Sequence, residues 1–181
     1  MTNDSIVYPS SATTRTARLF VQQGRRPRNA EEQAAYVRAY LLKSKACPIE
    51  IVIACAEEMA KLIAGEDCTL IPVPDSKGYT TQNSWLCHTI AMREQAGYIQ
   101  VMDILTRHTA TESQCQRHRK GKAPLPPEQL NISVIPHKPF TLTRIYFVDN
   151  VITSGATIQA CRDALGFGTG LVYAEALRNR R

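Results

Sequence analysis

The segment 144–157, RIYFVDNVITSGAT, brings an acid, an amide and several hydroxyl side chains together around one glycine. The apolar run before Asp149 predicts a buried strand, and the turn around Gly155 predicts a helix from Ala156 onward. The first amides of a helix lack partners and lie at the positive end of its dipole, so this turn suits a phosphate. Asp149 would repel that phosphate at close range. We therefore expect its carboxylate one sugar-length away, on ribose hydroxyls or facing a hydrated Mg²⁺.

Strand and helix patterns alternate along the rest of the chain. Apolar runs predict strands at 69–74, 98–105, 132–135, 144–149 and 171–177, and helical spacing predicts helices from Asn83 and over 156–165. This alternation is typical of an α/β domain, so we expect a Rossmann-like, open and mostly parallel sheet flanked by helices. Ligands of such sheets bind beyond the carboxyl ends of the strands, where Asp149 and Asn150 would lie.

The first part of the chain has a different pattern. Residues 1–28 are rich in Ser, Thr and Arg, and we interpret them as an extended arm or a loosely packed start. Asn29 and Glu32 have the spacing of a capping box, which predicts one helix, and a second helix is predicted over 48–65. We therefore expect an N-terminal arm and helical hood over 1–68, followed by a core over 69–181.

The composition is that of a globular protein. At 181 residues, with 44% hydrophobic and 21% charged residues, the chain is long enough for one ordinary domain. The formal net charge of +6 suits an anionic ligand or nucleic acid and selects neither. No apolar run approaches the ~20 residues that span a bilayer, and no secretory signal is visible. Because no apolar run is long enough, we expect a protein that does not enter a membrane. The six cysteines form no C-x-x-C pair, and without a secretory signal we expect reduced thiols in a cytoplasmic protein.

Segment 144–157 resembles the phosphoribosyl-diphosphate (PRPP) signature of type I phosphoribosyltransferases, in which an apolar run precedes two acids, a hydrophobic pair and Thr-Thr/Ser-Gly-x-Thr. Together with residues 70–86, LIPVPDSKGYTTQNSWL, and the region around Arg107, it is similar to the ComF-like branch of that family. The resemblance covers residues 69–178 and implies the type I phosphoribosyltransferase fold. Asn150 departs from it, because the family usually has a second acid there. The cysteine-rich zinc segment that often begins ComF-like relatives is also missing.

The resemblance implies a role for each motif. The catalytic residues would be Asp149 and Asn150, which face the ribose hydroxyls, and Thr153, which takes the position of a general base or a base-side contact. The 5-phosphate would bind Ser154, Gly155, Ala156 and Thr157, and pyrophosphate would bind Asp75, Ser76, Lys77 and Gly78. A mobile basic loop with Arg107, Arg117, Arg119 and Lys120 would close over the reaction. Mg²⁺ would bind through PRPP near Asp149, with no direct protein ligand assigned.

The implied reaction is the displacement of pyrophosphate from C1 of PRPP by a ring nitrogen of a nucleobase-like acceptor. Asn150 carries no negative charge, which leaves a PRPP-binding regulator without turnover as an alternative. A competence- or DNA-associated protein is a second alternative, because segment 107–122 is basic. That segment contains no Phe, Tyr or Trp, which argues against a single-strand stacking platform. A homodimer is one assembly consistent with the resemblance.

Overall fold

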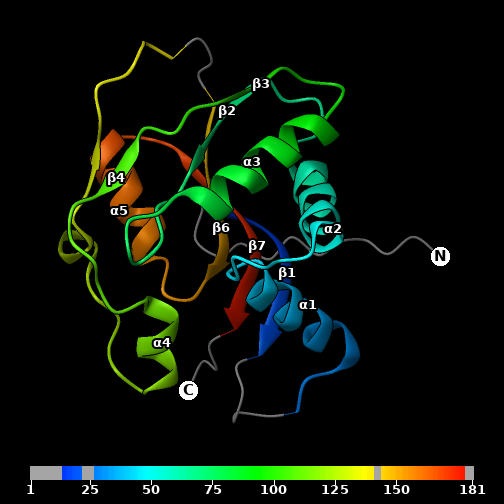
Figure 1. Ribbon diagram of the computed structural model, residues 1–181, viewed down its shortest axis with the longest axis vertical. Helices are drawn as coiled ribbons and strands as arrows, with labels where there is room; N and C mark the ends of the chain where they lie inside the picture. The colour runs from blue at the N-terminus through cyan, green and yellow to red at the C-terminus, as the bar shows by residue number, and fades with distance from the viewer. Residues whose placement is uncertain (1–13, 22–26, 141–143, 178–181) are drawn as a thin grey trace.

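A computed structural model of the chain describes residues 14–21, 27–140 and 144–177 (Figure 1). Its centre is a five-stranded sheet in the order β1-β7-β6-β2-β3, in which every neighbouring pair is parallel. The strands are β1 (Thr14–Val21), β2 (Cys68–Pro72), β3 (Ile99–Val101), β6 (Ile145–Ile152) and β7 (Thr169–Leu177). The predicted α/β architecture with a mostly parallel sheet is therefore confirmed.

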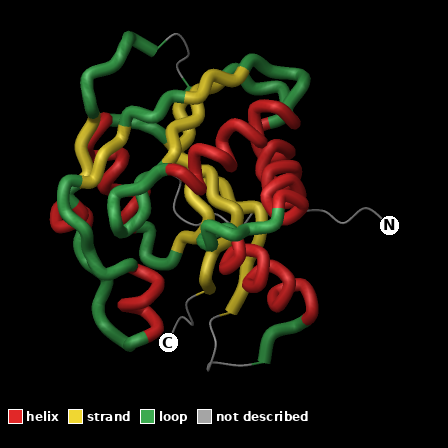
Figure 2. The backbone as a smooth tube through the Cα atoms, in the orientation of Figure 1, coloured by secondary structure: helices red, strands yellow, loops and turns green. Residues whose placement is uncertain are grey.

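Helices cover both faces of this sheet (Figure 2). On one face lie α1 (Ala30–Leu41), α2 (Ile49–Ala60) with the 3₁₀ turn η1 (Lys61–Ile63), and α3 (Thr81–Arg93). On the other face lie α5 (Ala156–Leu165) and a small antiparallel pair, β4 (Leu105–Arg107) with β5 (Ile132–Val134). Between β4 and β5 the chain forms α4 (Gln114–Arg119) and the 3₁₀ turn η2 (Pro127–Leu130).

The core divides into two clusters, one on each side of the sheet. In β6 the side chains of Tyr146 and Val148 pack with α1, α2 and α3, whereas Ile145 and Phe147 pack with α5 and the β4–β5 pair. This alternation follows from the two-residue period of a strand. Because both faces of β6 are covered, its apolar run is continuous, as is usual in parallel sheets.

Local signals at the helix ends act as expected. Asn29 caps α1 by accepting from the amide of Glu32 at 2.8 Å, and the Glu32 carboxylate accepts from the Asn29 amide at 3.1 Å. Both halves of the predicted capping box are therefore present. Gly166 ends α5 with φ +92°, a left-handed conformation that glycine adopts without strain.

The N-terminal segment differs from its prediction. Residues 14–21 form β1, a sheet strand that pairs with β7, rather than an arm. Its Phe20 is buried among residues of α1, α2 and β7, and its Arg15 bonds to Glu66 at 2.7 Å. Helices α1 and α2 likewise share one core with β6 and β7, so the hood expected over 1–68 has no separate core in the described residues.

A second correction concerns the strand predicted at 98–105. The chain leaves the main sheet after β3, and Leu105 begins β4, which pairs with β5 on the α5 side. One apolar run therefore serves two sheets, because Met102 and Ile104 pack against the second core cluster. Among the described residues, no helix has the length and apolar character needed to cross a membrane.

The strand order creates a switch point between β2 and β6. The chain leaves β2 toward β3 on one side and later returns to place β6 on the other side of β2. Crevices for ligands form beyond the carboxyl ends of the strands at such reversals. Those ends carry the loop after Pro72 and the β6 residues from Asp149 onward.

Candidate functional site

A cavity of about 730 Å³ lies at this switch point. The sheet supplies its floor through the end of β6, and the first turn of α5 supplies one wall. The remaining walls come from the loop after β2, the start of α3, the segment after β4 and the loop after α1. Segments that are far apart in the sequence therefore meet at one edge of the sheet.

The first turn of α5 presents unpaired amides to this cavity. Gly155 adopts φ +80°, and its carbonyl accepts from the amide of Gln159 at 3.0 Å. The amide of Ala156 donates to Ser154 Oγ at 3.3 Å. Within the described parts of the chain, the amides of Gly155, Thr157 and Ile158 have no hydrogen-bond acceptor. Three donors at the positive end of a helix are therefore available to an anion.

Three of the four residues predicted to bind the 5-phosphate, Ser154, Gly155 and Thr157, line the cavity. The fourth, Ala156, does not line the cavity, and its amide bonds to the Ser154 hydroxyl. Thr153, predicted as a catalytic residue, lines it as well.

Asp149 lies on the cavity wall in the second half of β6, one residue beyond the last residue of β6 that pairs with β2. Its Oδ1 accepts from the Asn150 amide at 2.8 Å and from Asn83 Nδ2 at 3.3 Å, whereas Oδ2 has no partner among the described residues. Burial raises the pKa of Asp149, and the positive charge of Lys43 acts in the opposite direction. One oxygen is thus held by the protein and the other is available to a ligand.

Asn150 and Asn83 complete this part of the site. Asn150 is 8% exposed, lines the cavity, and its side-chain amide bonds to no other residue in the described regions. Asn83, on α3, also donates to the carbonyl of Val73 at 2.7 Å, which ties α3 to the chain just after β2. The sequence analysis did not assign Asn83 to the site, although a polar residue on the buried side of a predicted helix is a signal for it.

The loop after β2 is organised by Asp75 rather than by a ligand. Asp75 Oδ1 accepts from the amides of Lys77 at 2.8 Å and Tyr79 at 2.9 Å, and the Asp75 carbonyl accepts from the Gly78 amide at 3.1 Å. These three amides are therefore engaged within the loop, and the binding of pyrophosphate by Asp75, Ser76, Lys77 and Gly78 stays a prediction. The Lys77 side chain and Ser76 still line the cavity.

The structure shows why position 78 requires glycine, which the sequence did not reveal. Gly78 adopts φ +93°, and a Cβ there would lie 3.1 Å from the carbonyl oxygen of Arg107. The amide of Thr111 also donates to the carbonyl of Ser76 at 2.8 Å. Glycine therefore allows the loop after β2 to pack closely against the segment after β4.

Arg107 forms part of the cavity wall. Arg107 is 8% exposed, and its Nη1 donates a hydrogen bond to Thr111 Oγ1 at 2.9 Å. Its Nε is buried without a partner in the described chain. Burial lowers the pKa of Arg107, while the charges of Asp149 and Asp75 oppose that shift. A desolvated guanidinium beside a cavity is a strong hydrogen-bond donor for an incoming anion.

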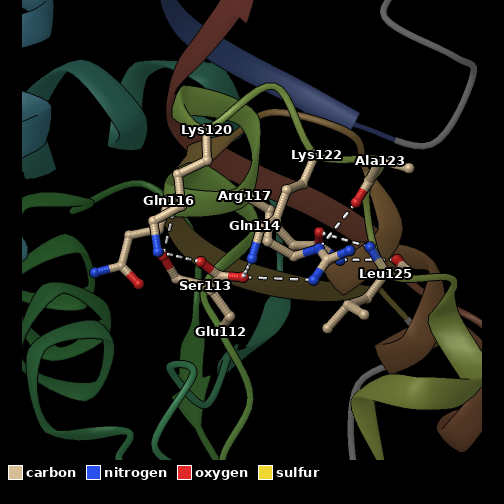
Figure 3. A network of polar contacts seen from close by, with 9 residues as sticks. All are labelled: Glu112, Ser113, Gln114, Gln116, Arg117, Lys120, Lys122, Ala123 and Leu125. Carbon is tan, nitrogen blue, oxygen red and sulfur yellow. Dashed lines mark hydrogen bonds and ion pairs between the residues drawn. The ribbon is translucent and has the colours of Figure 1, made fainter.

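The other basic residues of this segment bond within it (Figure 3). Glu112 accepts from Lys120 at 2.7 Å, from Lys122 at 3.2 Å and from Arg117 at 3.4 Å. Arg117 Nε also donates to the carbonyl of Ala123 at 2.8 Å. Neither Arg117 nor Lys120 lines the cavity, and both are held by Glu112. Closure of this segment over a ligand stays a prediction. The side chain of Arg119 lies outside the described part of the structure.

Two cations that the sequence analysis missed do line the cavity. Lys43 and Lys45 lie in the loop between α1 and α2, in the part of the chain that the resemblance does not cover. Their spacing, KSK after an amphipathic helix, carries no motif by which they could be recognised.

Comparisons with protein-family models and with curated protein sequences find no match for this chain. Function therefore has to be inferred from the geometry of the site. Among the described residues, no group of three or more His, Cys, Asp or Glu side chains is arranged to hold a metal ion. A cation held only by one or two carboxylate oxygens and by ligand phosphates needs no such group.

Proposed function

We propose that this protein is a Mg²⁺-dependent phosphoribosyltransferase that binds PRPP at the carboxyl edge of β2 and β6. The observation that carries the proposal is the meeting of two features in one cavity. The open Oδ2 of Asp149 and the unpaired amides of Gly155 and Thr157 line the same space. A carboxylate suits a ribose diol, and the start of a helix suits the 5-phosphate on the same sugar.

The cations of the cavity are suited to a departing diphosphate. The Lys77 side chain and Arg107 line the wall beside the loop after β2, and Arg107 is already desolvated. Fixed charges in a site that excludes water stabilise developing charge with little reorganisation. In the proposed step the C1–N bond to the acceptor forms as the C1–O bond breaks. The electron pair of the C1–O bond leaves with pyrophosphate, and an acceptor nitrogen that carries a proton releases it to water.

The donor set fits magnesium that arrives with the ligand. Mg²⁺ keeps several waters and is usually bound by one or two carboxylates together with substrate phosphates. Asp149 Oδ2 is the open carboxylate oxygen at this point, and the diphosphate of PRPP would supply the remaining anionic ligands. When bound, the ion would neutralise charge on the leaving group.

Ligand binding is the first test of this function. PRPP with Mg²⁺ should raise the melting temperature in proportion to the logarithm of its concentration, because it binds only the folded state. Ribose 5-phosphate should give a smaller rise. Pyrophosphate release should then appear with at least one member of a panel of ring-nitrogen acceptors. A melting temperature unchanged at saturating PRPP would exclude the proposal.

A regulator that binds PRPP without turnover is the second candidate. Two observations favour it: Asn150 supplies no charge toward the sugar cation, and Glu112 holds Arg117, Lys120 and Lys122 away from the cavity. It predicts the same thermal stabilisation with no pyrophosphate release across the panel. Because these cations already have an anionic partner, the DNA-associated alternative has less support.

A further inference from the structure

The turn after β2, residues 75–79, has few free donors to offer a diphosphate. The amides of Lys77 and Tyr79 donate to Asp75 Oδ1 at 2.8 and 2.9 Å. The Gly78 amide donates to the Asp75 carbonyl at 3.1 Å. The turn contains one carboxylate, Asp75, and one ammonium group, Lys77, so its net charge is zero. A group with several negative charges therefore needs cations from other parts of the cavity.

The loop between α1 and α2 brings two further cations to this cavity. Leu42 and Cys47 fix the ends of the loop in the core, because both are buried. The Cys47 amide donates to the carbonyl of Ser44 at 3.1 Å, which closes the loop into a turn. Lys43 and Lys45 extend from this turn, and both line the cavity. Their backbone positions are thus set by the core of the protein.

The surroundings of the two lysines place them beside Asp149 and the turn after β2. Lys45 Nζ lies 5.7 Å from the centroid of the Tyr79 ring, in the same turn as Lys77. The charge of Lys43 acts on Asp149, where it opposes the effect of burial on the pKa. Within the described residues, the side chains of Lys43, Lys45 and Lys77 form no ion pair and no hydrogen bond. Three ammonium groups in one cavity are therefore available to an anion.

We propose that Lys43 and Lys45, together with Lys77, bind the diphosphate of PRPP and determine the preference of the site for a diphosphorylated sugar. This inference rests on the proposed function and adds two specificity-determining residues to the same site. They come from a part of the chain that the resemblance to phosphoribosyltransferases does not cover. The ammonium groups would supply the donors that Asp75 withdraws by occupying the amides of the turn.

The diphosphate fits these lysines better than the 5-phosphate does. The 5-phosphate already has donors in the unpaired amides of Gly155 and Thr157 at the start of α5. Lys45, in contrast, lies over the turn that carries Lys77. Hydrogen bonds from ammonium groups to phosphate are charge-assisted and roughly twice as strong as neutral ones. We therefore expect the lysines to act on the part of PRPP that ribose 5-phosphate lacks.

The test compares ligands that share the sugar and the 5-phosphate and differ in the diphosphate. Calorimetry on the full chain with Mg²⁺ measures the dissociation constants of PRPP, ribose 5-phosphate and inorganic pyrophosphate. The wild type should bind PRPP at least tenfold more tightly than ribose 5-phosphate. The double variant Lys43→Met with Lys45→Met removes the charges and keeps most of the apolar stems. It should lower the affinities for PRPP and pyrophosphate at least fivefold and leave that for ribose 5-phosphate within twofold.

Two further variants separate charge from structure. Lys61→Met with Lys138→Met removes two exposed lysines that do not line the cavity, and it should keep the full preference for PRPP. Lys43→Arg with Lys45→Arg keeps both charges and should restore most of the preference. A purely structural role of the loop would instead change the affinities for PRPP and ribose 5-phosphate by the same factor.

The outcomes separate this inference from the proposed function. If the wild type binds both sugar phosphates and the double variant keeps the preference for PRPP, the inference is wrong and the function stands. The same conclusion follows if the wild type binds both equally, or if the double variant loses both affinities equally. If neither PRPP nor ribose 5-phosphate binds to the wild type, both proposals fall.

Discussion

Asn83 donates a hydrogen bond to the carboxylate of Asp149, with 3.3 Å between Nδ2 and Oδ1. Asn83 lies in the first turn of α3 and Asp149 in the second half of β6, and the same Nδ2 bonds to the carbonyl of Val73 at 2.7 Å. The bond orients Asp149 so that Oδ1 is occupied and Oδ2 is open to the cavity. A pre-oriented acceptor needs little reorganisation when a ligand binds.

Replacing Asp149 with Asn should weaken PRPP binding without lowering the stability of the unliganded protein. Asn keeps an oxygen that can accept the bonds from Asn150 and Asn83, and it removes a partly buried charge. We expect PRPP affinity to fall at least tenfold by calorimetry, with an equal or higher melting temperature at pH 7. Asp163→Asn is the control, because Asp163 is exposed on α5 and bonds only to Gln159 in the described residues.

The carboxyl group of Asp149 should also make the stability of the wild type depend on pH in a way that Asp149→Asn does not. Burial raises the pKa of Asp149 above that of the unfolded chain, so the folded state binds more protons between the two values. Wild-type stability should therefore decrease as pH rises through this window, and Asp149→Asn should lack that decrease. PRPP affinity should show the opposite trend, rising as Asp149 ionises. Urea unfolding and calorimetry at several pH values measure both, and parallel trends would contradict this account.

Gly155→Ala should weaken phosphate binding, whereas Gly166→Ala should not. Both glycines adopt positive φ, at +80° and +92°, so each alanine should lower the free energy of unfolding by about 1 kcal/mol. Only Gly155 lies at the start of α5, where a shift of the backbone would move the unpaired amides. Ribose 5-phosphate titrations should show at least a fivefold loss for Gly155→Ala alone. An equal loss in both variants would assign the effect to stability.

Glu112→Gln should strengthen PRPP binding. The carboxylate holds three cations of the segment after β4, and Ser113 and Gln114 beside it line the cavity. Removing its charge frees these cations to move toward a polyanion. We expect a five- to tenfold gain in PRPP affinity at low salt, which decreases as ionic strength rises.

Glu128→Gln is the matched control, because it changes the net charge of the protein by the same amount. Glu128 lies in the turn η2, where it is exposed and forms no ion pair in the described residues. Its PRPP affinity should stay within twofold of the wild type. A loss of affinity in Glu112→Gln would show instead that the network around Glu112 supports the cavity wall.

Glu66→Gln should destabilise the fold at neutral pH. Burial alone would raise the pKa of Glu66, but bonds from Tyr146 at 2.6 Å and Arg15 at 2.7 Å outweigh it, and the pKa is lowered. The stabilisation is therefore present above the unfolded pKa and is lost as pH falls through the folded value. We expect a loss of about 2 kcal/mol at pH 7 that shrinks in acid.

Urea unfolding of Glu66→Gln beside Glu50→Gln checks this result. Glu50 is exposed in the first turn of α2, so its replacement should change the free energy of unfolding by less than about 0.5 kcal/mol. A difference between Glu66→Gln and the wild type that stays constant down to acidic pH would contradict the linkage.

Several elements could be predicted from sequence because their signals are local. The apolar run before Asp149 and the turn at Gly155 led to the strand and the helix that the structure shows as β6 and α5. The capping box at Asn29 was also predicted correctly. The run over 98–105 was misassigned, because its division between two sheets depends on partners distant in the chain. The strand at 14–21 was missed because its short polar-rich pattern needs β7 as a partner.

The candidate site shows the same division. Sequence alone determined the parts that depend on neighbours in the chain: the unpaired amides of a helix start and a carboxylate at the end of a strand. Only the tertiary structure decided which distant residues join them. It brings Lys43, Asn83 and Arg107 to the same cavity and holds Arg117 and Lys120 on Glu112. The reason is that hydrogen bonding in a turn depends on adjacent residues, whereas the meeting of side chains depends on strand order and packing across the sheet.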